Sequence, residues 1–238
     1  MELLPSEIHV WSTDLNISDE EEQQKLALLA PDECERAARF RFPNHRQRYI
    51  AARATLRQLL GMYLNCLPES LSFSYTEHQK PFLTSPDYQA LQFNLAHSDA
   101  IAIYAFNLNH AIGIDIEKVQ GTFNQSVAER YFSEKENQAL NTLSNEEKLL
   151  GFYRIWSRKE AIVKAVGKGF SIPLASFSVS ATDELESITL ENKNWSLLPL
   201  TLHPHYQSAL ACNRMIETVK FWRFFNQEIA LEKVIHHP

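Results

Sequence analysis

The fold is decided by two stretches of the chain, AIGIDIE at residues 111–117 and WSRKEAIVKAVGKG at residues 156–169. In the first stretch isoleucine alternates with other residues, which predicts a strand whose two faces differ. The isoleucines lie on one face, and Gly113, Asp115 and Glu117 share the other. The second stretch has helical spacing and ends at a glycine, which predicts a helix over Trp156 to Val166 that stops at Gly167.

Each half of the chain shows helices followed by strands. In the first half, Ser18 with Glu21 has the form of a capping box, Pro31 suits a first helical turn, and a third helix is expected from Asn44. The strands expected after it are residues 71–75, 91–95, 100–106 and 111–117.

The second half has capping boxes at Ser133/Glu136 and Ser144/Glu147, before the helix that ends at Gly167. The strands expected after that helix are residues 177–180, 187–190, 195–200, 208–212 and 219–225. Helices followed by strands favour an α+β fold over a doubly wound parallel sheet. We expect two α+β halves, residues 1–108 and residues 109–238.

An internal alignment supports a duplication of one α+β unit. Aligning Gly61 with Gly167 places Arg48 on Arg154 and Arg53 on Lys159. Only small and basic residues match in this alignment, so the duplication is a hypothesis.

Length and composition indicate an ordinary globular protein. The 238 residues are 45% hydrophobic and carry a formal net charge of −6, which argues against a protein that coats nucleic acid with its whole surface. Three separated cysteines give neither a disulfide framework nor a zinc motif. The first residues lack a signal peptide pattern, and no apolar stretch is long enough to span a membrane, so we expect a cytoplasmic protein.

Basic residues are concentrated in one segment of the first half. Residues 36–57 contain seven arginines and no aspartate or glutamate. Either an anionic ligand meets this segment, or the arginines cover the core and pair with the acidic run at residues 19–22.

Asp115 and Glu117 share one face of a predicted strand, where two negative charges repel each other and raise each other's pKa. Magnesium would resolve this repulsion, because it prefers carboxylate oxygens and keeps positions open for water and phosphate. The alternative is a pair of solvated carboxylates at a strand end.

Trp156, Glu160 and Lys164 are spaced at intervals of four residues and therefore lie along one side of the predicted helix. By itself this pattern also fits an exposed Glu/Lys ion pair beside a core tryptophan. Together with the strand carboxylates and Lys159, it offers what phosphoryl or pyrophosphate chemistry needs: oxygen ligands for a metal, cations for phosphate charge, and a proton acceptor.

These residues resemble the two signatures of the Sfp-type 4′-phosphopantetheinyl transferases, GIDIE and W-x-x-K-E-A-x-x-K. Upstream, Gln79-Lys80-Pro81-Phe82 resembles the family's G-K-P-aromatic turn, and residues 94–98, NLAHS, resemble its N-x-S-H-S segment. The chain departs from the family at Gln79, where the family has glycine, and at Ala96, where it has serine. Ala96 cannot donate a hydroxyl to a phosphate, so Ser98 or a backbone N–H would have to replace it.

The resemblance implies two similar α+β halves related by a pseudo-twofold axis, with the active site in the cleft between them. It implies Mg²⁺, with Mn²⁺ as a substitute, on Asp115, Glu117 and Glu160. It further implies that Lys159 and Lys164 face the pyrophosphate of coenzyme A. The implied contacts to the coenzyme A phosphates are Arg36, Arg48, Lys80 and His97, with Ser98.

The implied reaction moves 4′-phosphopantetheine from coenzyme A to a serine of an acyl or peptidyl carrier protein and releases 3′,5′-ADP. Glu160 is expected as metal ligand, general base or both, with Lys164 and Lys159 as the other catalytic groups. Two halves in one chain favour a monomer. The carrier protein could serve fatty-acid, polyketide, nonribosomal-peptide or glycolipid synthesis.

Two other functions compete with this one. A metal-dependent nuclease or phosphohydrolase could use the same carboxylates and Lys164 to activate water, although no aromatic platform accompanies the arginines. A catalytically silent module that binds carrier proteins would keep the cleft but would not need the metal residues.

Overall fold

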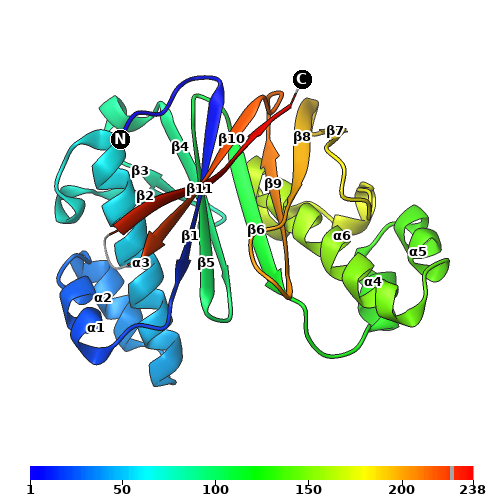
Figure 1. Cartoon of the computed structure of the whole chain (residues 1–238), viewed down its shortest axis with the longest axis horizontal. Helices are drawn as coiled ribbons and strands as arrows, with labels where there is room; N and C mark the ends of the chain where they lie inside the picture. Colours follow the sequence, from blue (N-terminus) through cyan, green and yellow to red (C-terminus); the bar gives the residue numbers. More distant parts are fainter. Residues whose placement is uncertain (226–227, 238) are drawn as a thin grey trace.

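The computed structural model describes residues 1–225 and 228–237 as two sheets packed face to face, with helices on the outer side of each (Figure 1). This is the α+β architecture that the order of helices and strands predicts. No helix within these residues is long and apolar enough to cross a bilayer.

The first half starts with a strand and three helices and ends with strands. Its elements are β1 (Glu7–Asp14), α1 (Asp19–Leu26), α2 (Pro31–Ala38), α3 (Pro43–Leu64), β2 (Phe73–Tyr75), β3 (Pro81–Leu83), β4 (Leu91–Ser98) and β5 (Ile101–Leu108). Two short 3₁₀ turns, η1 (Pro68–Ser70) and η2 (Pro86–Tyr88), lie between strands. Helix α3 continues through Gly61 and ends at Asn65, whose φ of 51° is left-handed.

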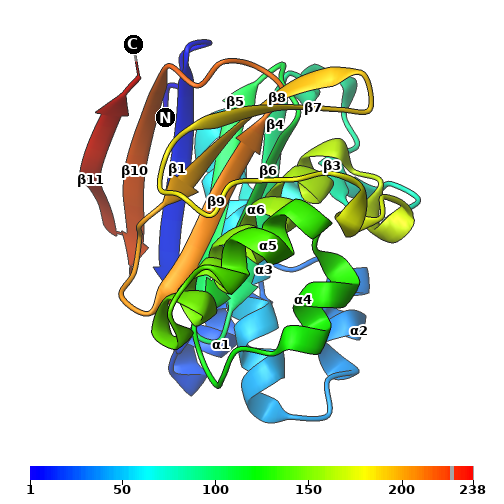
Figure 2. The same cartoon turned by 90° about the vertical axis from the view of Figure 1, so that its right-hand side faces the viewer.

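The second half repeats this plan. Its elements are β6 (Ile112–Lys118), α4 (Gln125–Tyr131), α5 (Glu134–Asn141), α6 (Asn145–Val166), β7 (Glu186–Leu190), β8 (Lys193–Leu200) and β9 (Tyr206–Cys212), with the 3₁₀ turns η3 (Gly169–Ser171) and η4 (Leu174–Ser176) before β7. The strand expected at residues 177–180 is wrong, since no strand forms there. Figure 2 shows α4, α5 and α6 in front of this sheet.

The first strand of each half pairs with the last strand of that half. The orders are β1-β5-β4 in one sheet and β6-β9-β8-β7 in the other, and these pairs are antiparallel. After β9 the chain returns to the first sheet, where β10 (Thr218–Phe225) pairs in parallel with β1 and β11 (Glu228–His236) forms the edge. The expected second half, residues 109–238, therefore does not keep its last two strands.

The apolar faces of the two sheets meet in a shared core. The three isoleucines of β6, at positions 112, 114 and 116, pack there against Ile8, Val10 and Ile103. This confirms the faces predicted for the strand at residues 111–117. A second core lies between the first sheet and α3, and a third lies between the second sheet and α6.

A buried arginine joins the elements of the first half. Arg57 of α3 is 1% exposed, and its Nε donates to Glu33, the third residue of α2, over 2.6 Å. Its Nη1 donates to the carbonyls of Pro68 and Leu71 over 3.0 and 2.9 Å.

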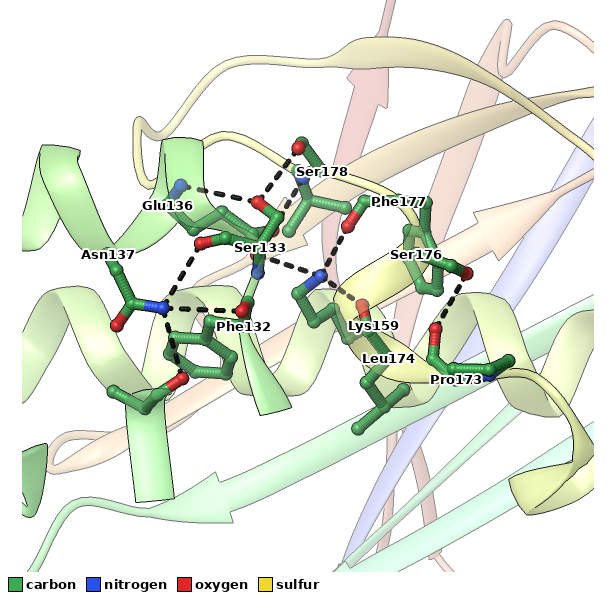
Figure 3. A network of polar contacts seen from close by, with 12 residues as sticks. Phe132, Ser133, Glu136, Asn137, Lys159, Pro173, Leu174, Ser176, Phe177 and Ser178 are labelled. Atoms are coloured by element: carbon green, nitrogen blue, oxygen red, sulfur yellow. Dashed lines mark hydrogen bonds and ion pairs between the residues drawn. The ribbon is translucent and has the colours of Figure 1, made fainter. Parts of the chain in front are cut away.

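Lys159 of α6 makes the same set of contacts in the second half (Figure 3). Its Nζ binds Glu136, the third residue of α5, over 2.8 Å. It also donates to the carbonyls of Leu174 and Phe177 over 2.7 and 2.6 Å. Each cation therefore joins a glutamate at the third position of a helix to two carbonyls three residues apart.

These contacts correct the register of the duplication. They place Arg57 on Lys159, whereas the alignment of Gly61 with Gly167 places Arg53 there. The left-handed helix ends, Asn65 and Gly167, match in the same way as Arg57 and Lys159. Matching glycine letters fails by one helical turn because Gly61 lies inside α3 and does not end it.

Candidate active site

Strand β6 lies directly on the backbone of α6 because Gly113 has no side chain. A Cβ at Gly113 would lie 2.1 Å from the Ala161 oxygen and 2.4 Å from the Ala165 nitrogen. Two positions along the same face, Asp115 meets Lys164, with 2.6 Å between Oδ1 and Nζ. The glycine therefore lets the strand approach closely enough to join these two charges.

The Asp115 carboxylate is only half satisfied. Its side chain is 4% exposed, and its second oxygen, Oδ2, is buried without a hydrogen-bond partner. Burial raises the pKa of Asp115, against the opposing effect of Lys164. An unpaired buried carboxylate oxygen is costly, and a bound cation would satisfy it.

Glu117 and Glu160 add negative charge around Asp115. Burial and the Asp115 charge raise the pKa of Glu117 to about 7, although Lys164, Ser98 and Trp156 lower it. Burial and Asp115 also raise the pKa of Glu160. Burial would lower the pKa of Lys164, but the surrounding carboxylates outweigh it and raise that pKa.

The expected metal ligands come near one another but form no ready-made metal cluster. Among residues 1–225 and 228–237, no three His, Cys, Asp or Glu side chains are grouped closely enough to hold an ion. The chemistry of Asp115, Glu117 and Glu160 still suits a divalent cation, because Asp115 Oδ2 lacks a partner and the Asp115 charge raises the pKa of both glutamates, but the three carboxylates would have to move closer together to hold one.

A cavity of about 430 Å³ lies where the two halves meet. Its walls come from α3, the β2–β3 hairpin, β4 and the end of α6. The expected site residues that line the cavity are Arg36, Lys80, His97, Glu160 and Lys164. The structure thus brings together residues of the α6 signature, the two upstream segments and the arginine-rich segment.

His97 and Arg48 are neighbours at this site. Burial and the charges of Lys164, Arg48 and His45 all lower the pKa of His97. Arg48 does not point freely at the cavity, because its Nη1 lies 2.8 Å from Asp99 Oδ1. Asp99 also accepts from Lys118 over 2.5 Å.

Two residues of the NLAHS segment bind the edge of β6. The Asn94 side-chain oxygen accepts from the Ile114 N–H over 2.8 Å. Ser98 Oγ accepts from the Lys118 N–H over 3.0 Å and donates to Glu117 over 3.2 Å. Ser98, expected at a phosphate, therefore holds the carboxylate strand, and β4 is joined to β6 through side chains.

Lys159 is not in the cavity, although it was expected at the pyrophosphate. Its side chain is 0% exposed and its ammonium binds Glu136 and two carbonyls inside the second half (Figure 3). It follows Arg158 and precedes Glu160 in α6, so it points to a different side of the helix from Glu160 and Lys164.

Lys80 lines the cavity with its stem, but its ammonium binds backbone carbonyls. Nζ donates to Ile112, Lys164 and Ala165 over 2.9, 2.7 and 3.4 Å. Burial lowers the pKa of Lys80 to about 8. The preceding Gln79 has a φ of 64°, which is left-handed and explains why glycine suits this position.

Most of the clustered arginines pair with carboxylates of the first half. Arg46 pairs with Glu22, while Arg53 and Arg57 share the buried Glu33. The sequence patterns did not identify Asn94, Asp99 and Glu33 as partners. Glu33 had a usable signal, since it is the third residue of a helix whose start is marked by Pro31.

Comparisons with known proteins identify the same two regions. Residues 111–212 match the 4′-phosphopantetheinyl transferase superfamily, and residues 14–109 match the family described as 4′-phosphopantetheinyl transferase, N-terminal. The chain is 36% identical over 224 residues to the 4′-phosphopantetheinyl transferase HetI of Nostoc sp., which covers 93% of this chain and 94% of the relative.

Similarity extends to other relatives. The 4′-phosphopantetheinyl transferase Sfp of Bacillus subtilis is 33% identical over 166 residues, covering 70% of this chain and 72% of that protein. The L-aminoadipate-semialdehyde dehydrogenase-phosphopantetheinyl transferase of Xenopus laevis is 29% identical over 204 residues, covering 77% and 68%.

Proposed function

Because the chain belongs to the 4′-phosphopantetheinyl transferase family, we propose that it transfers 4′-phosphopantetheine from coenzyme A to a serine of an acyl or peptidyl carrier protein. The observation that carries this proposal is the Asp115–Lys164 pair with its unpaired carboxylate oxygen, beside a cavity lined by cations. Family membership favours this reaction over the nuclease and over the silent module.

The coenzyme A phosphates would lie among the cations at the cavity. Arg36 and Lys164 line it as cations, His97 lines it as a hydrogen-bonding imidazole whose pKa is lowered, and Arg48 lies beside His97. Several positive groups in one partly enclosed space favour a ligand with several phosphates. Lys80 and Lys159 are left out of this set because their ammonium groups bind carbonyls and, for Lys159, Glu136.

Asp115, Glu117 and Glu160 would hold Mg²⁺, with Mn²⁺ as a substitute. A bound divalent cation supplies positive charge that stabilises the negative charge of a transferring pyrophosphate. The unpaired Asp115 Oδ2 and the repulsion between Asp115 and the two glutamates support this assignment.

Glu160 and Lys164 face the reacting groups from α6. The serine oxygen of the carrier protein attacks the phosphorus attached to pantetheine, and the bond from that phosphorus to the bridging oxygen breaks. Glu160, whose pKa is raised, takes the serine proton, and Lys164 offsets charge on the leaving 3′,5′-ADP. No covalent intermediate on the protein is required.

The test is mass spectrometry of an apo carrier protein incubated with this protein, coenzyme A and Mg²⁺. We expect the carrier to gain the mass of one phosphopantetheine. Asp115→Ala and an EDTA control should abolish the gain. No gain with several fatty-acid and peptidyl carriers would overturn the proposal, and cleavage of a phosphodiester without any carrier would favour the nuclease.

A further inference from the structure

Lys80 belongs to the first half of the chain, but its ammonium group ends in the second half. It lies at the end of the turn between β2 and β3, just before Pro81. Its three hydrogen bonds go to Ile112 at the start of β6 and to Lys164 and Ala165 at the end of α6. An ammonium has three N–H donors, so all of them are used.

The acceptors are groups that a helix leaves unsatisfied. Helix α6 ends at Val166, and the N–H of the cap residue Gly167 donates to the Val163 carbonyl. The carbonyls of Lys164 and Ala165, which follow, belong to the groups that a helix end leaves without a partner in the helix. The carbonyl end of a helix also carries partial negative charge, which attracts a cation. The Lys80 ammonium therefore caps α6 and at the same time binds the first residue of β6.

The turn that carries Lys80 is itself held in place. The Thr76 N–H donates to the Lys80 carbonyl over 3.0 Å, and the Lys80 N–H donates to Thr76 Oγ1 over 3.1 Å. On the far side, a Cβ at Gly167 would lie 3.6 Å from Lys80 Cδ, so the lysine stem passes directly over the helix end.

The two elements that Lys80 joins carry the four charged groups of the site. Asp115 and Glu117 lie on β6, and Glu160 and Lys164 lie on α6. We propose that Lys80 is a positioning residue, which locks the start of β6 to the end of α6 and so fixes the spacing of these four groups. This inference rests on the proposed function for its effect on catalysis, but not for its effect on the structure.

The competing assignment is a direct contact between Lys80 and a phosphate of coenzyme A. That contact would require the ammonium to give up carbonyl bonds that satisfy a buried helix end. The two assignments separate kinetically, because a phosphate contact acts on substrate binding and a positioning contact acts on the rate of the bound complex.

Hydrogen exchange tests the structural part without any ligand. We expect Lys80→Met to speed exchange about tenfold in peptides covering residues 111–118 and 160–169, because local opening becomes easier there. Lys168→Met is the matched control, since Lys168 stands just past the same helix end but is exposed and pairs with Glu191. Unchanged exchange in Lys80→Met would overturn the proposal.

Steady-state kinetics and Mn²⁺ binding test the functional part. For Lys80→Met we expect kcat to fall about tenfold to hundredfold, with little change in the KM for coenzyme A. Titration with Mn²⁺ alone should show weaker binding to Lys80→Met than to the wild type. Lys80→Arg, which keeps charge and donors, should recover part of both.

A large rise in KM at unchanged kcat and unchanged Mn²⁺ affinity would identify a phosphate ligand and overturn the inference. A lower thermal stability with unchanged Mn²⁺ affinity and unchanged kcat per folded molecule would also overturn it, because it would leave Lys80 a purely structural role. If the wild type transfers nothing to any carrier, the proposed function fails, while the hydrogen-exchange result still decides whether Lys80 holds β6 to α6.

Discussion

The two halves hold a buried cation at the same point of their long helices, but the residues after that cation differ between them. In α3, the residues one and five positions after Arg57 are Gln58 and Met62; in α6, the residues at the same distance after Lys159 are Glu160 and Lys164. Both halves have the cation and its glutamate at the third position of a shorter helix. The charged groups that face the cavity from these positions belong to the second half.

The difference separates two roles within one signature. In W-x-x-K-E-A-x-x-K, the first lysine joins α6 to α5 and to the residues around η4, whereas the glutamate and the second lysine reach the site. The first half can therefore keep its fold without carrying the chemistry.

The largest expected effect comes from removing the buried cation of one half, Arg57 or Lys159. Lys159→Met leaves the buried Glu136 and two carbonyls without their cation, so we expect a loss of about 3–5 kcal/mol in the free energy of unfolding. Arg57→Met should cost less, because Glu33 keeps its ion pair with Arg53. Urea unfolding measures both losses. Lys159→Arg and Arg57→Lys give each half the cation that the other half uses, and they should lower the free energy of unfolding much less.

An exposed ion pair contributes less than about 1 kcal/mol to the free energy of unfolding. A loss that small in both methionine variants would contradict the buried role of these cations.

Changing the residue after each cation should separate the halves by activity instead. Glu160→Gln should lower kcat about hundredfold, because the proton acceptor is lost while the shape is kept. Gln58→Ala, at the matching position of α3, should leave kcat unchanged. Transfer to a carrier protein measures both, and comparable losses of kcat would remove the functional asymmetry between the helices.

Lys80, which crosses from one half to the other, should give stability a particular pH dependence. Burial lowers its pKa from 10.5 to about 8, so between these values the unfolded chain holds a proton that the folded chain does not. The free energy of unfolding of the wild type, minus that of Lys80→Met, should therefore rise as pH rises from about 8 to 10.5.

Urea unfolding at several pH values measures this difference. A difference that stays flat or falls over the same range would show that burial does not lower the pKa of this lysine.

The smallest expected effect concerns the turn that carries Lys80. Gln79 has a φ of 64°, so Gln79→Gly should raise the free energy of unfolding, by less than about 1 kcal/mol because glycine also costs entropy. The control is Ala27→Gly, at a φ of −65°, which should lower it. Destabilisation by Gln79→Gly as large as that of the control would argue against strain at this turn.

The sequence predicted the parts of the fold that depend on local patterns. The alternation in β6 indicated the correct faces, because its isoleucines and its glycine with Asp115 meet different partners. Capping boxes marked the starts of α1, α5 and α6. Strand β1 has no such signal: its Glu7, His9, Ser12 and Thr13 are buried by long-range neighbours.

The site was predictable as a set of residues but not as a set of contacts. Asp115, Glu160 and Lys164 share the site as their spacing indicates. The ammonium groups of Lys80 and Lys159 bind carbonyls that lie far from them in the sequence, such as those of Ile112 and Leu174. The sequence pattern does not indicate these contacts. A lysine in a signature shows that a cation is needed, but does not show whether phosphate or backbone receives it.

The most direct test of the distinction between scaffold and chemistry compares Lys159→Met with Lys164→Met. Transfer of phosphopantetheine to a carrier protein is measured for both at a temperature where circular dichroism shows both folded, with kcat and KM corrected for the folded fraction. We expect Lys159→Met to keep kcat/KM within about fivefold, while Lys164→Met loses about hundredfold or more. A loss of the same size in folded Lys159→Met would contradict this distinction, by placing Lys159 among the groups that act on the phosphates.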